Sequence, residues 1–268
     1  MRSFRHVPLT VLVAIALPAI AAAQGGGPGG PGGAPGGGGQ QQPPKNLQVL
    51  PKDMPRAEVV ARMRTFTGAL GVRCEYCHVA VKLPDGREQV QDYSLDDKDT
   101  KKTARDMLRM VGDINDKYLK AMGRTMTDRT RVSCETCHHG IAKPRTIQAE
   151  VGAAIDAAGP DSAIALYRDL RTRYYMRQSY DFGELALTQY QQYASGPEKL
   201  PAAIAILKLN LEFYPTSVPT MSALAAAQVQ AGDTAAAVQT LNKALVIQPD
   251  NPQVRGLLGR LKPPAPQD

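Results

Sequence analysis

All four cysteines of this 268-residue chain lie in two copies of one pentapeptide, and no other feature restricts its fold as strongly. The copies read Cys74-Glu75-Tyr76-Cys77-His78 and Cys134-Glu135-Thr136-Cys137-His138. Residues i, i+3 and i+4 share one face of a helical turn, so two thiols and one imidazole can reach a porphyrin from the same side. This spacing is typical of c-type haem attachment. We therefore predict two covalently bound haems c, with thioether bonds from Cys74, Cys77, Cys134 and Cys137 and with His78 and His138 as iron ligands.

Three other uses of paired cysteines compete with this interpretation. Disulfides are common in exported proteins, and a zinc site could use both pairs. Neither use explains why a histidine follows each pair. A thioredoxin-like redox pair is expected in a βαβ context, whereas the sequence around both pairs has helical periodicity.

The second axial ligand of each iron can be argued by counting histidines. The chain has four, and one of them, His6, lies in an N-terminal segment that we expect to be removed. Two of the others are the predicted iron ligands, and His139 adjoins one of them, so its ring points away from that iron. Methionine is the usual remaining ligand of an electron-transfer haem. The alternative is an open site.

Methionines on two predicted helices are candidates for this role. A helix over residues 55–70, with a proline in its first turn and Gly71 as its stop, carries Met63 on an apolar stripe. A second helix over residues 99–122 carries Met107 and Met110 on nearly the same face. Periodicity alone does not choose between these two.

The N-terminal residues predict export. Residues 1–23 combine a basic start, an apolar run and a small-residue cleavage pattern, Ala21-Ala22-Ala23, as in a secretory signal peptide. Residues 24–46 are rich in Gly, Pro and Gln, a composition that predicts a disordered linker. We therefore expect a periplasmic protein.

The C-terminal part, residues 151–262, predicts helical repeats, followed by a short tail at 263–268. Ala203, Leu207, Leu211 and Pro215 recur as Ala237, Leu241, Leu245 and Pro249, each 34 residues later. This is the period of tetratricopeptide repeats. A looser unit begins near Ser162, and the second repeat should open with a helix from about Pro219 to Ala231. Such repeats either dock a protein partner or serve as a packing cap.

The N-terminal half also resembles a known family. The run Leu50-Pro51-Lys52-Asp53-Met54, followed by Met63 and by Ala69-Leu70-Gly71-Val72-Arg73, is similar to the cytochrome c subunit of photosynthetic reaction centres. So is the run from Ala104 to Met110, with Ile114-Asn115 after it. The resemblance covers roughly residues 47–144, within a predicted haem domain at 47–148. It implies units of helix, turn and haem motif, with Met63 and Met107 as axial ligands. The chain has two motifs where well-known members have four, and it lacks their additional histidine beyond Asn115.

These features together predict an all-α fold, a multihaem c-type cytochrome domain followed by helical repeats. The expected function is transfer of single electrons between protein partners, a membrane-bound photosynthetic reaction centre being one candidate partner. The alternative is a di-haem enzyme, such as a peroxidase, with one open iron site; we favour an electron carrier, not an enzyme. The formal net charge is +7, but no Lys/Arg cluster with interleaved aromatic residues indicates a nucleic-acid surface.

Overall fold

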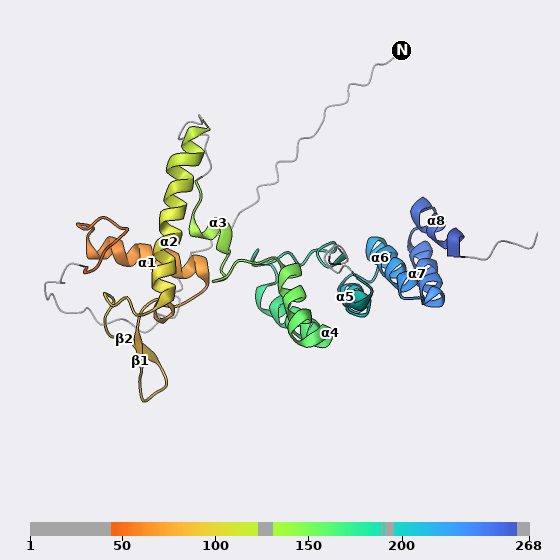
Figure 1. The fold of residues 1–268 in the computed structure, drawn as a ribbon, viewed down its shortest axis with the longest axis horizontal. Helices are drawn as coiled ribbons and strands as arrows, with labels where there is room; N and C mark the ends of the chain where they lie inside the picture. Colours follow the sequence, from red (N-terminus) through yellow and green to blue (C-terminus); the bar gives the residue numbers. More distant parts are fainter. Residues whose placement is uncertain (1–43, 123–130, 189, 191–195, 262–268) are drawn as a thin grey trace, which may run out of the picture. The chain divides into compact units, whose positions relative to one another are not determined.

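The computed structural model describes residues 44–122, 131–188, 190 and 196–261, and most of these are helical (Figure 1). The all-α class is confirmed. One feature was not predicted, a small antiparallel hairpin of β1 (Ala80–Lys82) and β2 (Glu88–Val90), in which Ala80 pairs with Val90. Its turn carries Asp85-Gly86, and Gly86 has a φ of 82°. Asp-Gly is a common hairpin-turn signal, so the sequence did contain information about this turn.

Helix α1 (Arg56–Leu70) ends where the sequence predicts. Gly71 adopts a left-handed conformation with φ 64°, and its N–H bonds to the Gly68 carbonyl. The N–H of Val72 bonds to the Thr67 carbonyl at 3.1 Å. A residue without a Cβ adopts this conformation at little cost, which is why glycine commonly ends helices.

Helix α2 (Asp99–Asp113) covers the first part of the second predicted helix and then widens into a π-helical segment, Ile114–Leu119. The Asn115 side chain donates a hydrogen bond of 2.9 Å to the Val111 carbonyl. In a regular α-helix that carbonyl would receive the Asn115 backbone N–H. Side-chain competition of this kind distorts helices, which accounts for the difference from the uninterrupted helix that periodicity predicted.

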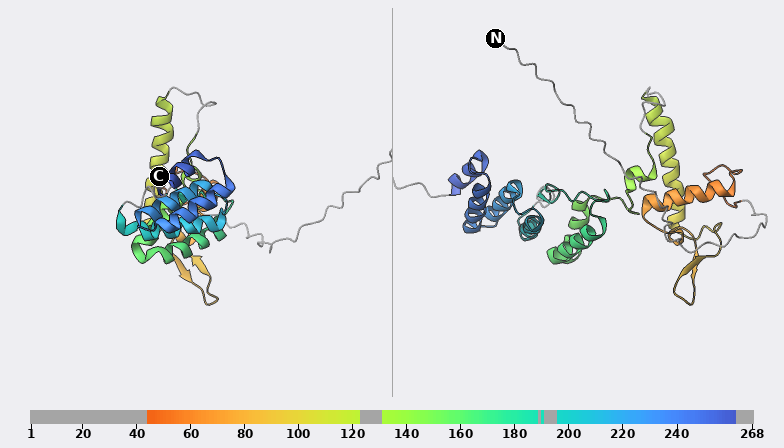
Figure 2. Two further views of the ribbon diagram at one scale, coloured as in Figure 1. Left: turned by 90° about the vertical axis from the view of Figure 1, so that its right-hand side faces the viewer. Right: turned by 180° about the vertical axis from the view of Figure 1, so that it is seen from behind.

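The C-terminal part consists of helices that pack in sequence order. They are α4 (Ile147–Tyr174), α5 (Leu200–Phe213), α6 (Val218–Gln230), α7 (Thr234–Ile247) and α8 (Pro252–Leu261). Helix α4 is two helices that meet at a kink, because Gly159 has φ 80° and ψ 177° and Pro160 follows it. Neighbouring members of the series α5 to α8 contact each other and lie side by side (Figures 1 and 2). Helices α5 and α7 begin and end 34 residues apart (234 − 200 and 247 − 213), and α6 coincides with the helix predicted near Pro219.

Buried apolar side chains are unevenly distributed along the described residues. One cluster joins α4 to α5 around Tyr167 and Ile206, and another joins α6, α7 and α8 around Leu241 and Val254. Within residues 44–122 and 131–144, the buried hydrophobic side chains are Met54 and Ile141 alone. The repeats therefore have an apolar core of their own, whereas the segment with the cysteine motifs buries little.

Three predictions lie outside the described residues. They are the signal peptide at 1–23, almost all of the linker at 24–46, and the tail at 263–268. Among the described helices, none combines the length and the apolar character that a membrane crossing requires.

Candidate functional site

Each cysteine motif forms the single helical turn that its spacing predicts. In the first motif, a 3₁₀ turn spans Cys74–Tyr76, and the His78 N–H bonds to the Cys74 carbonyl at 3.0 Å. In the second, α3 spans Cys134–His138. The four cysteines are free thiols, and no cluster of three or more His, Cys, Asp or Glu side chains among the described residues could hold a metal ion. Among the described residues, the cysteines thus form no disulfide and no shared four-ligand zinc site.

The first motif is held by the N-terminal turn of α2. The Tyr76 carbonyl accepts a hydrogen bond of 2.6 Å from Thr100 Oγ1, and the Glu75 carbonyl accepts one from Lys98 Nζ. The two residues between the cysteines therefore anchor the motif through their backbone. On its other side, the His78 ring meets the Tyr93 ring edge to face, with centroids 5.0 Å apart.

The second motif is held by the opposite helix, because it packs on the C-terminal end of α1. The Gly140 N–H bonds to the Ala69 carbonyl at 2.9 Å. Gly71 approaches the same loop so closely that a Cβ on it would lie 2.0 Å from the Gly140 oxygen. The first motif, which follows α1, is thus bound to α2, and the second motif, which follows α2, is bound to α1. We call this crossed anchoring the interlock.

Asn115 fixes the segment that leads into the second motif. This side chain is 3% exposed and bonds to both backbone groups of Val132, donating to its carbonyl at 2.8 Å and accepting from its N–H at 2.9 Å. With the bond to Val111, it joins α2 to the chain just before Cys134. Asn115 was named in the sequence analysis only as part of the family resemblance, and its hydrogen bonds to Val132 were not predicted. The π-helical segment around it is a local signal often found at functional sites.

We expect Asn115→Ala to destabilise the fold by about 2–3 kcal/mol, because it leaves part-buried backbone groups unpaired. Haem attachment at Cys134 and Cys137 should fall while attachment at Cys74 persists. Thermal unfolding and peptide mass mapping measure the two effects. Asn251→Ala is the matched control, since Asn251 lies at the start of α8, where its side chain accepts from the Val254 N–H at 3.1 Å and donates to Gln248. If both variants attach haem equally well, Asn115 does not position the second motif.

The two predicted iron-binding histidines differ in their surroundings. His138 Nδ1 lies 2.9 Å from the Ile141 carbonyl, so a proton on Nδ1 leaves Nε2 as a free ligand. Histidines that bind a metal through one ring nitrogen are usually oriented by a hydrogen bond from the other ring nitrogen to a carbonyl. Burial lowers the pKa of His78, and the charge of nearby Lys101 lowers it further. Both effects favour the neutral imidazole that iron ligation requires.

A charged cluster lies beside the first motif. Asp96 Oδ1 pairs with Lys101 Nζ at 3.0 Å and with Arg105 at 2.8 Å. Hydrogen bonding, first from Arg105, holds the pKa of Asp96 well below its usual range. Both cationic side chains are only 12% exposed.

The structure places the candidate axial methionines on the expected helices but does not choose among them. Met63 is half-buried on α1, and on α2 Met107 and Met110 are 37% and 45% exposed. His139 is exposed, with a left-handed backbone at φ 46°, and its carbonyl accepts a hydrogen bond from Ser179. A covalent haem fits these residues, because the porphyrin would offer apolar surface to the methionine-bearing faces.

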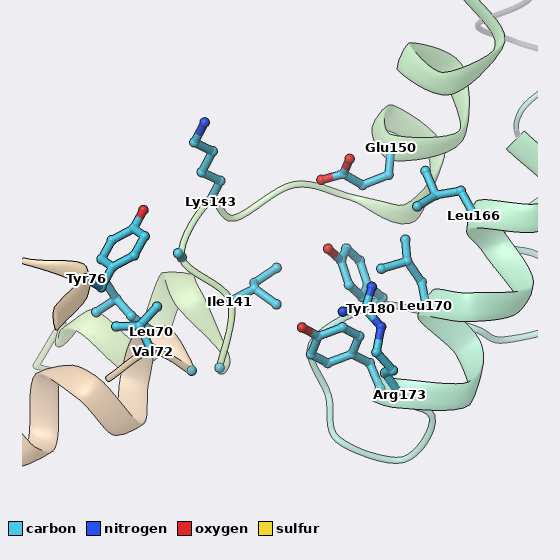
Figure 3. Close-up of a pocket in the computed structure, with 14 residues that line it drawn as sticks. Leu70, Val72, Tyr76, Ile141, Lys143, Glu150, Leu166, Leu170, Arg173 and Tyr180 are labelled. Carbon is cyan, nitrogen blue, oxygen red and sulfur yellow. The ribbon is translucent and has the colours of Figure 1, made fainter. Parts of the chain in front are cut away.

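A cavity of about 390 Å³ lies next to the loop that follows the second motif. Leu70, Val72 and Ile141 line one side, and Leu170, Tyr180 and Arg173 line the other (Figure 3). The Ser179 hydroxyl donates to the His139 carbonyl at 2.6 Å near this place. The loop after the second motif therefore contacts the end of α4 and the segment that follows it.

Two helices that bear methionines, each followed in the chain by a single-turn Cys-x-x-Cys-His segment, are typical of a c-type cytochrome. Residues 38–151 match the family model described as photosynthetic reaction centre cytochrome C subunit, and residues 196–261 match a tetratricopeptide repeat. Residues 38–151 are thus similar to the reaction-centre cytochrome c subunit family, and tetratricopeptide repeats follow them.

Two curated relatives agree with this assignment. Cytochrome c-554 of Chloroflexus aurantiacus is 33% identical over 95 residues, which are 35% of this chain and 20% of the relative. The photosynthetic reaction center cytochrome c subunit of Rubrivivax gelatinosus is 29% identical over 90 residues, 31% of this chain and 22% of the relative. The matches thus span only about a fifth of the length of these relatives. No solved structure matches the chain significantly.

Proposed function

We propose that this chain is an exported, periplasmic cytochrome that binds two haems c and carries single electrons between redox proteins. Cys74 and Cys77 would hold the first haem, with His78 and Met63 on its iron. Cys134 and Cys137 would hold the second, with His138 and Met107 on its iron. The observation that carries the proposal is the interlock, in which each single-turn motif is anchored on the helix of the other unit.

The similarity to two cytochromes supports the assignment of haem and of electron transfer. A haem supplies reversible one-electron chemistry when bound, and the residues of this chain attach it, ligate its iron and shield it. Histidine with methionine closes an iron to outside ligands and raises its potential, as an electron carrier requires. The proposed partners are redox proteins, with a membrane-bound photosynthetic reaction centre as one candidate. Tetratricopeptide repeats are compatible with docking of such a protein.

We expect the exported protein to start near Gln24 and to carry two covalent haems. Intact mass should exceed that of the processed chain by two haem groups, and a pyridine haemochrome assay should give two haems per chain. Zinc in place of haem, or a mass without haem, would rule the proposal out.

Carbon monoxide distinguishes the carrier from the alternative, a di-haem peroxidase with one open iron site. With methionine on both irons, the reduced protein should bind carbon monoxide slowly or not at all. Rapid binding at one of the two haems would favour the enzyme.

A further inference from the structure

The fold places three cationic side chains beside the first motif. At the first motif, Lys98 Nζ donates to the Glu75 carbonyl, and Lys101 Nζ donates to the Tyr93 carbonyl at 2.9 Å. Lys101 and Arg105 share a single carboxylate, Asp96, while Glu75 is paired with Arg73 at 2.7 Å. Lys101 and Arg105 thus share one carboxylate, and Asp92 is a second carboxylate close to Lys101. Because the Lys101 and Arg105 side chains are 12% exposed, salt screens them weakly.

The two histidines also differ in their hydrogen bonds. His138 Nδ1 has a carbonyl partner, that of Ile141, at 2.9 Å. His78 Nδ1 is buried and has no hydrogen-bond partner of normal geometry among the described residues. The Tyr93 carbonyl lies close to the His78 ring, and it accepts a hydrogen bond of good geometry from Lys101 Nζ.

The cations at the first motif and the hydrogen bond at His138 would act on the bound irons in opposite ways. An imidazole that donates to a carbonyl is a more basic ligand, which stabilises ferric iron at the second motif. Nearby cations oppose the extra positive charge of ferric iron, and so they stabilise ferrous iron at the first motif. Net charge and hydrogen bonding around the ligands are established means by which a protein sets a haem potential.

We propose that the haem at Cys74-Glu75-Tyr76-Cys77-His78 has the higher potential, and that Lys101 sets this order through the Tyr93 carbonyl. The inference rests on the proposed binding of two haems. With one electron on the pair, the iron held at His78 would be reduced and the iron held at His138 would stay oxidised. Transfer between them would move one electron and no proton. Lys101 acts as a positioning residue, because it reaches the iron ligand through Tyr93.

The test is a redox titration of the intact two-haem protein. In Lys101→Gln the ammonium is lost and the Tyr93 carbonyl is released, so the higher of the two potentials should fall while the lower stays in place. Asp96→Asn removes the neighbouring anion and should move the higher potential upward. Opposite shifts from these two variants are not expected of a purely structural role.

Lys102→Gln is the matched control, because Lys102 follows Lys101 in α2, is 56% exposed and pairs with Asp99. It should leave both potentials close to those of the parent. The inference is overturned if Lys101→Gln shifts the lower potential, shifts both equally or shifts neither, or if Lys102→Gln has the same effect. A haemochrome assay is run on each preparation. Fewer than two haems in the parent would overturn the proposed function, whereas two haems with unresponsive potentials would overturn this inference alone.

Discussion

Gly71→Ala should be among the most damaging single substitutions in the chain, with an expected loss of about 3 kcal/mol or more. An L-residue in the left-handed conformation costs about 1–2 kcal/mol. The added Cβ would also lie 2.0 Å from the Gly140 oxygen and 2.9 Å from its carbonyl carbon, both backbone atoms. The loop of the second motif must therefore move away from α1, which breaks the bond from the Gly140 N–H to Ala69. Thermal unfolding and the yield of haem at Cys134 and Cys137 measure the effect.

Gly68→Ala provides a control of the same chemistry on the same helix. Gly68 lies inside α1, and nothing lies within 4 Å of a Cβ placed on it. Alanine in a helix is favoured over glycine by about 1 kcal/mol, so this variant should be slightly more stable than the parent. Equal stability of the two variants would show that α1 and the Gly140 loop are not in contact.

Met107→Leu should convert one of the two haems to an altered or open form. Loss of a thioether ligand removes the sulfur–iron charge-transfer band of that haem and lowers its potential. Met110→Leu should keep the band and cost less than about 1.5 kcal/mol, as a volume-conserving exchange of an apolar side chain. Near-infrared spectra and redox titration of the two variants decide between them.

Comparison of these two variants is informative because Met107 and Met110 have similar surroundings in the structure. They are 37% and 45% exposed on one face of α2, so neither burial nor periodicity separates them, and only the family resemblance favours Met107. Loss of the band in Met110→Leu with its retention in Met107→Leu would reverse the assignment.

Local signals predicted the parts of this fold that depend on neighbours in sequence. Gly71 ends α1 as expected, and the 34-residue period gives α5 and α7. The Asp85-Gly86 turn is an equally local signal, but the hairpin that it forms was not predicted. Assignment of the iron ligands stays a prediction, as do the signal peptide and the linker.

The interlock could not be predicted, because it joins residues far apart in the chain. The sequence around Gly71 does not indicate that this residue contacts Gly140. The sequence around Asn115 does not indicate that its side chain bonds to Val132. These contacts depend on how two helices and two loops come together in space. Helical periodicity specifies which face of a helix is apolar, but not which backbone group will be placed against it.

The crossed anchoring also has a consequence for the order in which the protein matures. A chain emerges from its N-terminus first, and the anchors of the first motif, Lys98 and Thr100, follow the residues they hold by 23 and 24 positions. The first motif is therefore left without its supports until α2 has emerged. The second motif instead meets an anchor that is already in place, since Ala69 precedes Gly140. Enzymes that attach haem along the emerging chain would thus meet the first cysteine motif before its anchoring residues are present. The second motif emerges after α1, so it can pack on α1 before haem is attached.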